Sequence, residues 1–253
     1  MPHVPLFVSE ERTGDSGAGL YGDVVHEIDW SAGQIMKTLD ALDISDNTLV
    51  IFTSDNGPWL SYGNHAGSAD PLREGKGTVF EGGVRVPFIA RWPDSIPANS
   101  VVSAPAMTID LFPTLAELLG DNEEGLAIDG VSIRRLLTSE TDSAVQEAYY
   151  FYYNRNELHA LRSGNWKLHF PHSYRTMTGQ SPGADGMPGK YDYDVSTGLE
   201  LYDLSSDVEE QFNVAAEYPD VVDRLTQLAD AKRRQLGDAL TGQQGSELRQ
   251  PGG

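Results

Sequence analysis

Two adjacent polar residues, Asp55 and Asn56, stand where α/β proteins commonly place their chemistry. They directly follow an apolar, β-branched run over residues 48–53, which is typical of a buried strand of a parallel sheet. Ligands of such sheets bind beyond the carboxyl ends of the strands. Carboxylate and amide oxygens suit Ca²⁺ or Mg²⁺ better than zinc. Because Asp-Asn-Gly is also a common turn sequence, these letters alone leave a metal site and a simple turn both open.

A second candidate is Lys76, which lies between Gly75 and Gly77. Glycine lets the backbone approach an anion closely, and the ammonium group would neutralise the charge of that anion. No strand leads directly into this segment, so it is not a Walker A loop. A flexible, solvated loop is the alternative interpretation. His3 is a third candidate, but it is one of six histidines and its residue type alone does not single it out.

Composition excludes several classes of protein. The 253 residues include 18 Lys and Arg against 38 Asp and Glu, a net charge of −20 that disfavours nucleic acid and anionic membrane surfaces as partners. No apolar run approaches the roughly 20 residues that span a bilayer. The first residues lack the basic and apolar regions of a signal peptide. Because the sequence contains no cysteine, it cannot form disulfides, thiolate metal sites or a cysteine nucleophile.

The elements that must position these residues follow from hydrophobic periodicity. The spacing of apolar residues predicts a helix over residues 20–42, with Asp23 off its apolar stripe. A strand is expected over 84–92, where Pro87 indicates a bulge or an edge position. A second helix is expected over 109–119, with Asp110 as a candidate N-cap and Gly120 closing it. This order indicates half of an α/β layered domain over residues 1–144.

From about residue 145 the pattern changes to short strands separated by turn residues. Strands over 148–153, 157–162, 166–170 and 199–203 predict a small antiparallel sheet, and a helix is expected over 219–240. Together these form the expected second domain, 145–240. The irregular stretch 171–198 is too long for a routine connection and is expected to be functional or mobile. Residues 241–253 are expected to be a disordered tail.

Taken together, these segments resemble the sulfatase family, and in particular its arylsulfatase-A-like members. The stretch GKGTVFEGGVRVP over residues 75–87 is similar to the family's G-K-x-x-x-x-E-G-G-x-R-x-P signature, and TSDNG over 53–57 resembles its second metal-binding segment. Further similar stretches follow the family's order: DWSAGQ at 29–34, DLFPTL at 110–115, DGVS at 129–132, GNWKL at 164–168 and ELYDL at 200–204. The resemblance implies the C-terminal part of an alkaline-phosphatase-like α/β fold. Its mixed or parallel sheet core would be flanked by helices and followed by a small antiparallel sheet with a packed helix.

The resemblance also implies a role for each candidate residue. Asp55 and Asn56 match two ligands of a Ca²⁺ ion, with Mg²⁺ less expected. Lys76 matches the lysine that pairs with the sulfate, and His3 matches the histidine that faces the substrate and assists the leaving oxygen. His65, in a less standard position, is a weaker candidate for substrate contact, and a solvated histidine is the alternative. We therefore expect Asp55, Asn56 and Lys76 to converge at the carboxyl end of the 48–53 strand, with His3 close by.

The expected function is hydrolysis of sulfate monoesters, with aryl sulfates, sulfated glycans and sulfolipids as candidate substrates. The family's nucleophile is a formylglycine made from a C/S-x-P-x-R motif, which this sequence lacks; Ala69-Asp70-Pro71-Leu72-Arg73 has alanine at the nucleophile position. The resemblance therefore implies the C-terminal half of a sulfatase, with the formylglycine in an upstream half and no activity of this half alone. Alternatives are a phosphonate or phosphate monoesterase of the same superfamily, and a degenerate, non-catalytic half. A periplasmic or secreted location is implied by the resemblance.

Overall fold

The computed structural model describes residues 2–120 and 126–249, which divide into two compact units. Unit 1 comprises the described parts of Met1–Ser68, Arg85–Val145 and Met177–Tyr191, and unit 2 those of Ala69–Val84, Gln146–Thr176 and Asp192–Gly253. The division is therefore not the single boundary near residue 145 that the sequence indicated. The segment that carries Lys76 groups with the C-terminal strands, whereas 177–191 groups with the N-terminal part.

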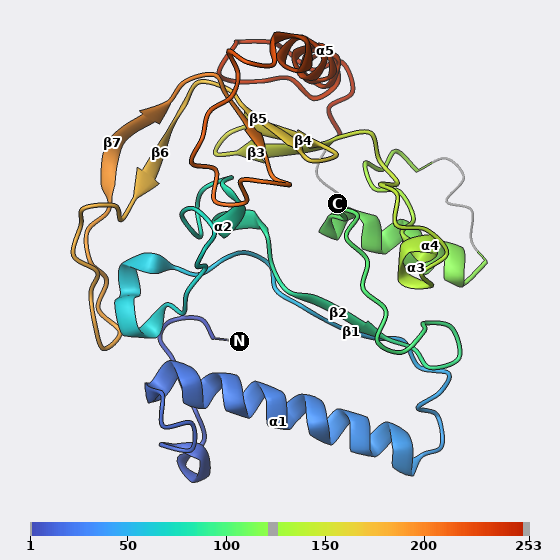
Figure 1. The fold of residues 1–253 in the computed structure, drawn as a ribbon. Coiled ribbons are helices and arrows are strands. Elements are labelled where there is room, and N and C mark those ends of the chain that lie inside the picture. The colour runs from blue at the N-terminus through green and yellow to red at the C-terminus, as the bar shows by residue number, and fades with distance from the viewer. Residues whose placement is uncertain (1, 121–125, 250–253) are drawn as a thin grey trace. The chain divides into compact units, whose positions relative to one another are not determined.

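Unit 1 contains a long helix and a two-stranded sheet (Figure 1). Helix α1 spans Gly19–Ala41 and confirms the predicted helix; strands β1, Val50–Thr53, and β2, Phe88–Arg91, form the sheet. The other elements are short: η1 Glu10–Arg12, η2 Leu60–His65, η3 Thr108–Asp110, α3 Leu111–Leu118 and α4 Arg134–Leu137. None of the helices in the described ranges is both long and apolar enough to cross a membrane.

The β1–β2 pair corrects two details of the sequence reading. The two strands are antiparallel, and no parallel partner of β1 lies within residues 2–120 or 126–249. Strand β1 is also only partly buried, since Phe52 is 44% exposed. Strand β2 begins at Phe88 rather than near residue 84, because Pro87 has no N–H to donate to the ladder. Residues Glu81–Val84 instead form the short helix α2, which belongs to unit 2.

Two aspartates of unit 1 are buried and bind backbone amides. Asp23 was expected off the apolar stripe of α1 but is 3% exposed, because its carboxylate accepts hydrogen bonds from the amides of Gly14 and Ser16 at 2.8 and 2.9 Å. Asp110 does not cap α3 with its side chain. It accepts instead from the amides of Met107 and Val131, both at 2.9 Å. Both carboxylates thus fix the loops that lead into or follow helices.

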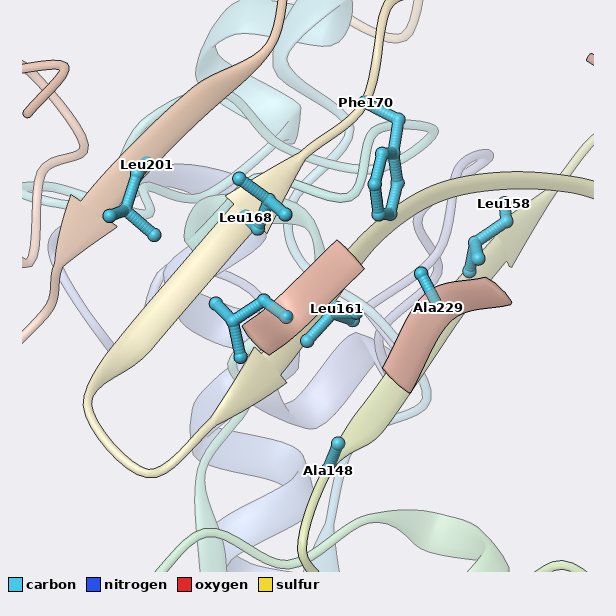
Figure 2. Close-up of a cluster of buried hydrophobic side chains, with 8 residues drawn as sticks. Ala148, Leu158, Leu161, Leu168, Phe170, Leu201 and Ala229 are labelled. Carbon is cyan, nitrogen blue, oxygen red and sulfur yellow. The ribbon is translucent and has the colours of Figure 1, made fainter. Parts of the chain in front are cut away.

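Unit 2 contains the expected antiparallel sheet with its helix. The sheet has the order β3-β4-β5-β8, and its strands are Tyr149–Tyr153, Glu157–Ser163, Trp166–His169 and Glu200–Asp203. Helix α5, Pro219–Leu236, packs on this sheet through Leu225 and Ala229. Figure 2 shows the resulting core, which is built from apolar residues of β4, β5, β8 and α5 and from the positions next to β3 and β5; its buried members are Ala148, Leu158, Leu161, Leu168, Phe170, Leu201, Leu225 and Ala229.

A second hairpin of unit 2 was not predicted. Strands β6, His172–Thr176, and β7, Asp192–Thr197, pair antiparallel within the stretch that the sequence left irregular. Tyr174 pairs with Val195 and Thr176 with Asp192, so the extra residue of the bulge lies in β7, opposite Arg175. The tail 241–253 was expected to be disordered, but its described part contacts α5. The amides of Ser246 and Glu247 donate to carbonyls of α5 at 2.9 Å. Residues 250–253 of that expected tail lie outside the described residues.

Candidate functional site

The predicted metal ligands lie in the loop that follows β1. Asp55 is exposed and Asn56 is half-buried, and the Ser54 hydroxyl donates to the Asn56 carbonyl oxygen at 3.2 Å. This places both side chains directly beyond the carboxyl end of the strand, as the sequence predicted. The chain bends at Asp55 and Asn56, which is compatible with both the turn interpretation and the ligand interpretation.

His3 lies beside this same loop. Its ring contacts that of Trp59 edge-on, with centroids 5.6 Å apart, and Trp59 in turn contacts Tyr62 at 4.9 Å. The Nδ1 of His3 donates to the Val4 carbonyl oxygen at 2.7 Å, and Nε2 is the ring nitrogen outside this hydrogen bond. Unit 1 therefore brings His3 to the segment that carries Asp55 and Asn56, although more than fifty positions separate them in the sequence.

Two segments of unit 1 are joined by hydrogen bonds: residues 60–65, and residues 183–191 of the stretch that was expected to be functional or mobile. The amides of Gly183 and Gly189 donate to the Ser61 carbonyl oxygen at 2.8 and 2.6 Å, and the side chain and amide of Asp185 bond the Asn64 side chain at 3.0 and 2.9 Å. His65, on the same loop, lies next to Gly186, and its Nδ1 is buried without a hydrogen-bond partner in the described part of the chain. The 60–65 and 183–191 segments thus form one surface.

Lys76 lies in unit 2, in a tight turn of the 73–78 segment. The amide and hydroxyl of Thr78 both donate to the Gly75 carbonyl oxygen, at 3.2 and 2.9 Å. The Lys76 carbonyl oxygen accepts from Nε and Nη2 of Arg175. Because Lys76 and the three residues above belong to different units, the convergence of all four stays a prediction. Arg175 was missed from the sequence, because nothing in its local pattern connects it to a lysine 99 positions away.

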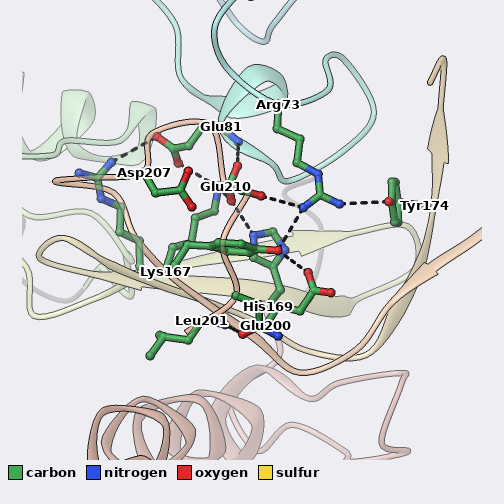
Figure 3. A network of polar contacts seen from close by, with 12 residues as sticks. Arg73, Glu81, Lys167, His169, Tyr174, Glu200, Leu201, Asp207 and Glu210 are labelled. Carbon is green, nitrogen blue, oxygen red and sulfur yellow. Dashed lines mark hydrogen bonds and ion pairs between the residues drawn. The ribbon is translucent and has the colours of Figure 1, made fainter. Parts of the chain in front are cut away.

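A buried charge network holds the helix that ends the Lys76 segment (Figure 3). Lys167 is fully buried and its Nζ lies 2.9 Å from Glu81 and 3.2 Å from Glu210. Glu210 also accepts from His169 at 2.8 Å and from the Glu81 amide at 2.5 Å. Burial by itself would raise the pKa of Glu210, but the charge of Lys167 and the hydrogen bond from His169 lower that pKa to about 2. Glu210 therefore stays ionised well below neutral pH.

The residues present fit a metal ion in chemistry but not in number. Asp55 and Asn56 offer hard oxygen atoms, whereas Ca²⁺ takes six to eight such ligands. Over residues 2–120 and 126–249, no group of three or more histidine, aspartate or glutamate side chains is arranged to hold a metal ion. A complete metal site therefore needs ligands beyond these two, and we derive no catalytic step through a metal from this chain.

Comparison with known proteins gives the same family along both parts of the chain. The sulfatase family model matches residues 2–121, the model for the C-terminal region of aryl-sulfatase matches 145–248, and that for the C-terminal part of N-sulphoglucosamine sulphohydrolase matches 75–169. These matches follow one another in the order that the sequence motifs indicated.

Individual relatives are similar over nearly the whole chain. An N-acetylgalactosamine-6-O-sulfatase of Bacteroides thetaiotaomicron is 36% identical over 242 residues, which are 90% of this chain and 45% of that protein. Human arylsulfatase A is 35% identical over 94% of this chain and 48% of its own length. A sulfatase crystal structure from Pseudoalteromonas sp. matches with a TM-score of 0.78 and 27% identity, over 91% of this chain and 46% of that one. The chain thus spans about half the length of the relatives it matches, and it belongs to the sulfatase family.

Proposed function

We propose that this chain contributes the lysine, a histidine and two metal ligands to a hydrolase of sulfate monoesters. The observation that carries the proposal is the pairing of two facts about one segment. The GKGTVFEGGVRVP stretch lies inside the region matched to sulfatases named for their activity, and hydrogen bonds to the carbonyl oxygens of Gly75 and Lys76 hold the backbone of the turn at its start. A lysine on a held backbone is suited to recognition of a sulfate anion.

The electrostatics of the chain make such a local cation necessary. A net charge of −20 repels an anionic ester in general. Lys76 would neutralise part of the sulfate charge at the site. His3 would lie near the ester oxygen that leaves and, with its Nδ1 donating to Val4, could exchange a proton there through Nε2.

Membership of the family is consistent with a metal cofactor, and we propose Ca²⁺ in preference to Mg²⁺. Asp55 and Asn56 would supply two of its oxygen ligands, and a flexible, carboxylate-rich shell suits Ca²⁺ better than the strict octahedron of Mg²⁺. The remaining ligands and the nucleophile would come from a segment that corresponds to the half of the relatives this chain does not match. A formylglycine in that segment would supply the attacking oxygen.

The substrate that we propose to test first is a 6-sulfated N-acetylgalactosamine, because the bacterial relative described above is named for that activity. Aryl sulfates, other sulfated glycans and sulfolipids form the comparison set. The joined loops of residues 60–65 and 183–191 would select among them, with His65 as a candidate contact. A periplasmic or secreted location, where such substrates are met, is part of the proposal.

The test compares hydrolysis of p-nitrophenyl sulfate by two proteins. The 253-residue chain alone should show no turnover, even with added Ca²⁺, because the loss of a nucleophile removes several orders of magnitude of rate. The same chain joined to a segment that carries C/S-x-P-x-R should turn over. In that longer protein Lys76→Ala should lower kcat/KM by at least about a hundredfold, while Lys37→Ala, at an exposed lysine of α1, should not. Turnover by the 253-residue chain that Asp55→Ala abolishes would refute the proposal.

The same assay separates the two alternative functions. A phosphonate or phosphate monoesterase would prefer a p-nitrophenyl phosphonate ester or p-nitrophenyl phosphate to the sulfate ester. A degenerate half would hydrolyse none of the three in either protein. We expect the sulfate ester to be preferred, since both curated relatives above are named as sulfatases.

A further inference from the structure

Three consecutive residues of β6 form hydrogen bonds with the turn that carries Lys76. The Tyr174 hydroxyl accepts from Nη2 of Arg73 at 3.2 Å, and the Thr176 hydroxyl donates to the Glu74 carboxylate at 2.6 Å. Between them, Arg175 donates from Nε at 3.2 Å and from Nη2 at 2.5 Å to the Lys76 carbonyl oxygen. We propose that Arg175 is a positioning residue that fixes Lys76 through this fork of two hydrogen bonds, from Nε and Nη2 to one carbonyl oxygen. The inference rests on the proposed role of Lys76 as the sulfate-binding cation.

The pairing of β6 with β7 is irregular at the level of Arg175. Tyr174 pairs with Val195, whereas Thr176 pairs with Asp192, so two steps along β6 face three steps along β7 and the extra residue of the bulge lies in β7. Such bulges are common beside functional sites.

The lysine turn is shaped to receive the guanidinium. Gly77 has a φ of +90°, and a Cβ at this position would lie 2.3 Å from Nη2 of Arg175 and 2.5 Å from its Cζ and Nε. A side chain at this position would have to displace the guanidinium, and the positive φ also favours glycine. The glycine after Lys76 thus serves the contact with Arg175, in addition to any approach by an anion.

Contacts of Arg73 fix the remainder of the turn. Arg73 also donates from Nη1 to the Tyr202 hydroxyl at 3.1 Å and to the Glu210 carbonyl oxygen at 3.0 Å, and its guanidinium lies 4.0 Å from the Phe80 ring centroid. A backbone fixed on both sides of Lys76 reduces the freedom that an anion would otherwise have to restrict on binding. Arg175 is the contact closest to Lys76 and therefore the one to test.

The test uses the chain of 253 residues with its lysines reductively dimethylated, a modification that keeps their charge. The chain has five lysines, of which Lys167 is fully buried, so few N-methyl NMR signals appear and Lys76→Arg assigns the one of interest. In the wild type, the Lys76 signal should report restricted motion compared with that of exposed Lys37. In Arg175→Ala it should become as mobile as Lys37, and amide exchange at Thr78 should accelerate at least about tenfold.

Two further variants separate positioning from general stability. Arg175→Lys keeps the charge but cannot form the fork, so Lys76 should be as mobile as in Arg175→Ala. Arg155→Ala, at an exposed arginine of the same unit, should leave Lys76 restricted. Amide exchange at Leu168 should stay slow in all of these variants, which shows that the core of unit 2 is intact. Full restriction of Lys76 in either Arg175 variant would overturn the inference.

A sulfate titration distinguishes failure of this inference from failure of the proposed function. Sodium sulfate, added against sodium chloride at equal ionic strength, should shift the Lys76 signal in the wild type and shift it at least about tenfold less at the same concentration in Arg175→Ala. If the Lys76 signal of the wild type reports restricted motion but does not shift with sulfate, this would count against the proposed function alone. A Lys76 that responds equally to sulfate in both proteins would overturn the positioning role while the proposed function stands.

Discussion

Acidification should destabilise unit 2 through His172, the first residue of β6. This side chain is 5% exposed, its Nδ1 donates to the Phe170 carbonyl oxygen at 2.7 Å, and its ring stacks on that of His159 with centroids 3.9 Å apart. Burial, and then repulsion from His159 and His169, lower the pKa of His172 from 6.5 to about 4, against smaller opposing contributions from the Phe170 hydrogen bond and the Glu157 carboxylate. The folded unit therefore keeps this ring neutral where the unfolded chain would protonate it.

The sign and size of the effect follow from the protons bound by each state. Between pH 6.5 and 4 the unfolded chain binds more protons than the folded one, so the free energy of unfolding falls as the pH drops. The contribution of His172 to that free energy has its full value only above pH 6.5. At about 1.4 kcal/mol for each pH unit, the loss between pH 7 and pH 4.5 is about 2 kcal/mol. His169 contributes in the same direction, because burial lowers its pKa as well. The low pKa of Glu210 extends the loss to lower pH, since its stabilisation disappears as the pH falls from 4.5 toward 2.

The assay is amide exchange at Leu161 and Leu168, which lie in the core of unit 2, at several pH values and constant ionic strength. His172→Asn keeps a nitrogen donor for Phe170 but cannot titrate. Between pH 7 and 4.5, the opening free energy of this variant should therefore fall by about 2 kcal/mol less than that of the wild type. His26→Gln, at an exposed histidine of α1, should retain the wild-type dependence. Equal pH dependence in the wild type and His172→Asn would refute the reasoning.

Three substitutions in unit 2 give further predictions. Leu201→Ala should lower the free energy of unfolding in urea by about 2 to 5 kcal/mol, because Leu201 is fully buried, whereas Leu199→Ala at a 43% exposed position should change it by less than about 0.5 kcal/mol. Lys167→Met should cost about 3 to 5 kcal/mol by the same measurement, because two carboxylates stay buried without their ammonium partner; wild-type stability would contradict this. Gly77→Ala should destabilise less in an Arg175→Ala background than in the wild type, and strictly additive costs would show that the two residues do not interact.

Apolar periodicity predicted the elements whose buried face is apolar. Strands β3, β4, β5 and β8 begin and end within a few residues of their expected positions, because they build a core from residues such as Leu161 and Leu201. The β6–β7 hairpin was missed because its buried side chains are polar. His172, Thr176 and Thr197 are each at most 7% exposed, and no apolar alternation marks such strands.

The candidate site was predictable in its residue types and only partly in its surroundings. Motif spacing located Asp55, Asn56 and Lys76, and the structure adds that His3 contacts Trp59 beside the first two. Arg175 could not be predicted, because its contact with Lys76 spans 99 positions. Residues that react carry a chemical signature in the sequence, whereas residues that position them are identified only through the fold.

The signature stretch itself contains residues whose role is to pack the segment rather than to react. Glu81 is buried and pairs with Lys167, so its role is to hold the segment in unit 2. A Cβ at Gly82 would lie 2.2 Å from the Glu74 carbonyl oxygen, so glycine is required there for backbone packing, and Gly77 admits Arg175. Within the part of the stretch that belongs to unit 2, Lys76 and Glu81 are the two ionic residues, and Glu81 is the buried one of the pair. Several positions of the family's signature stretch are therefore explained by how the backbone around Lys76 packs.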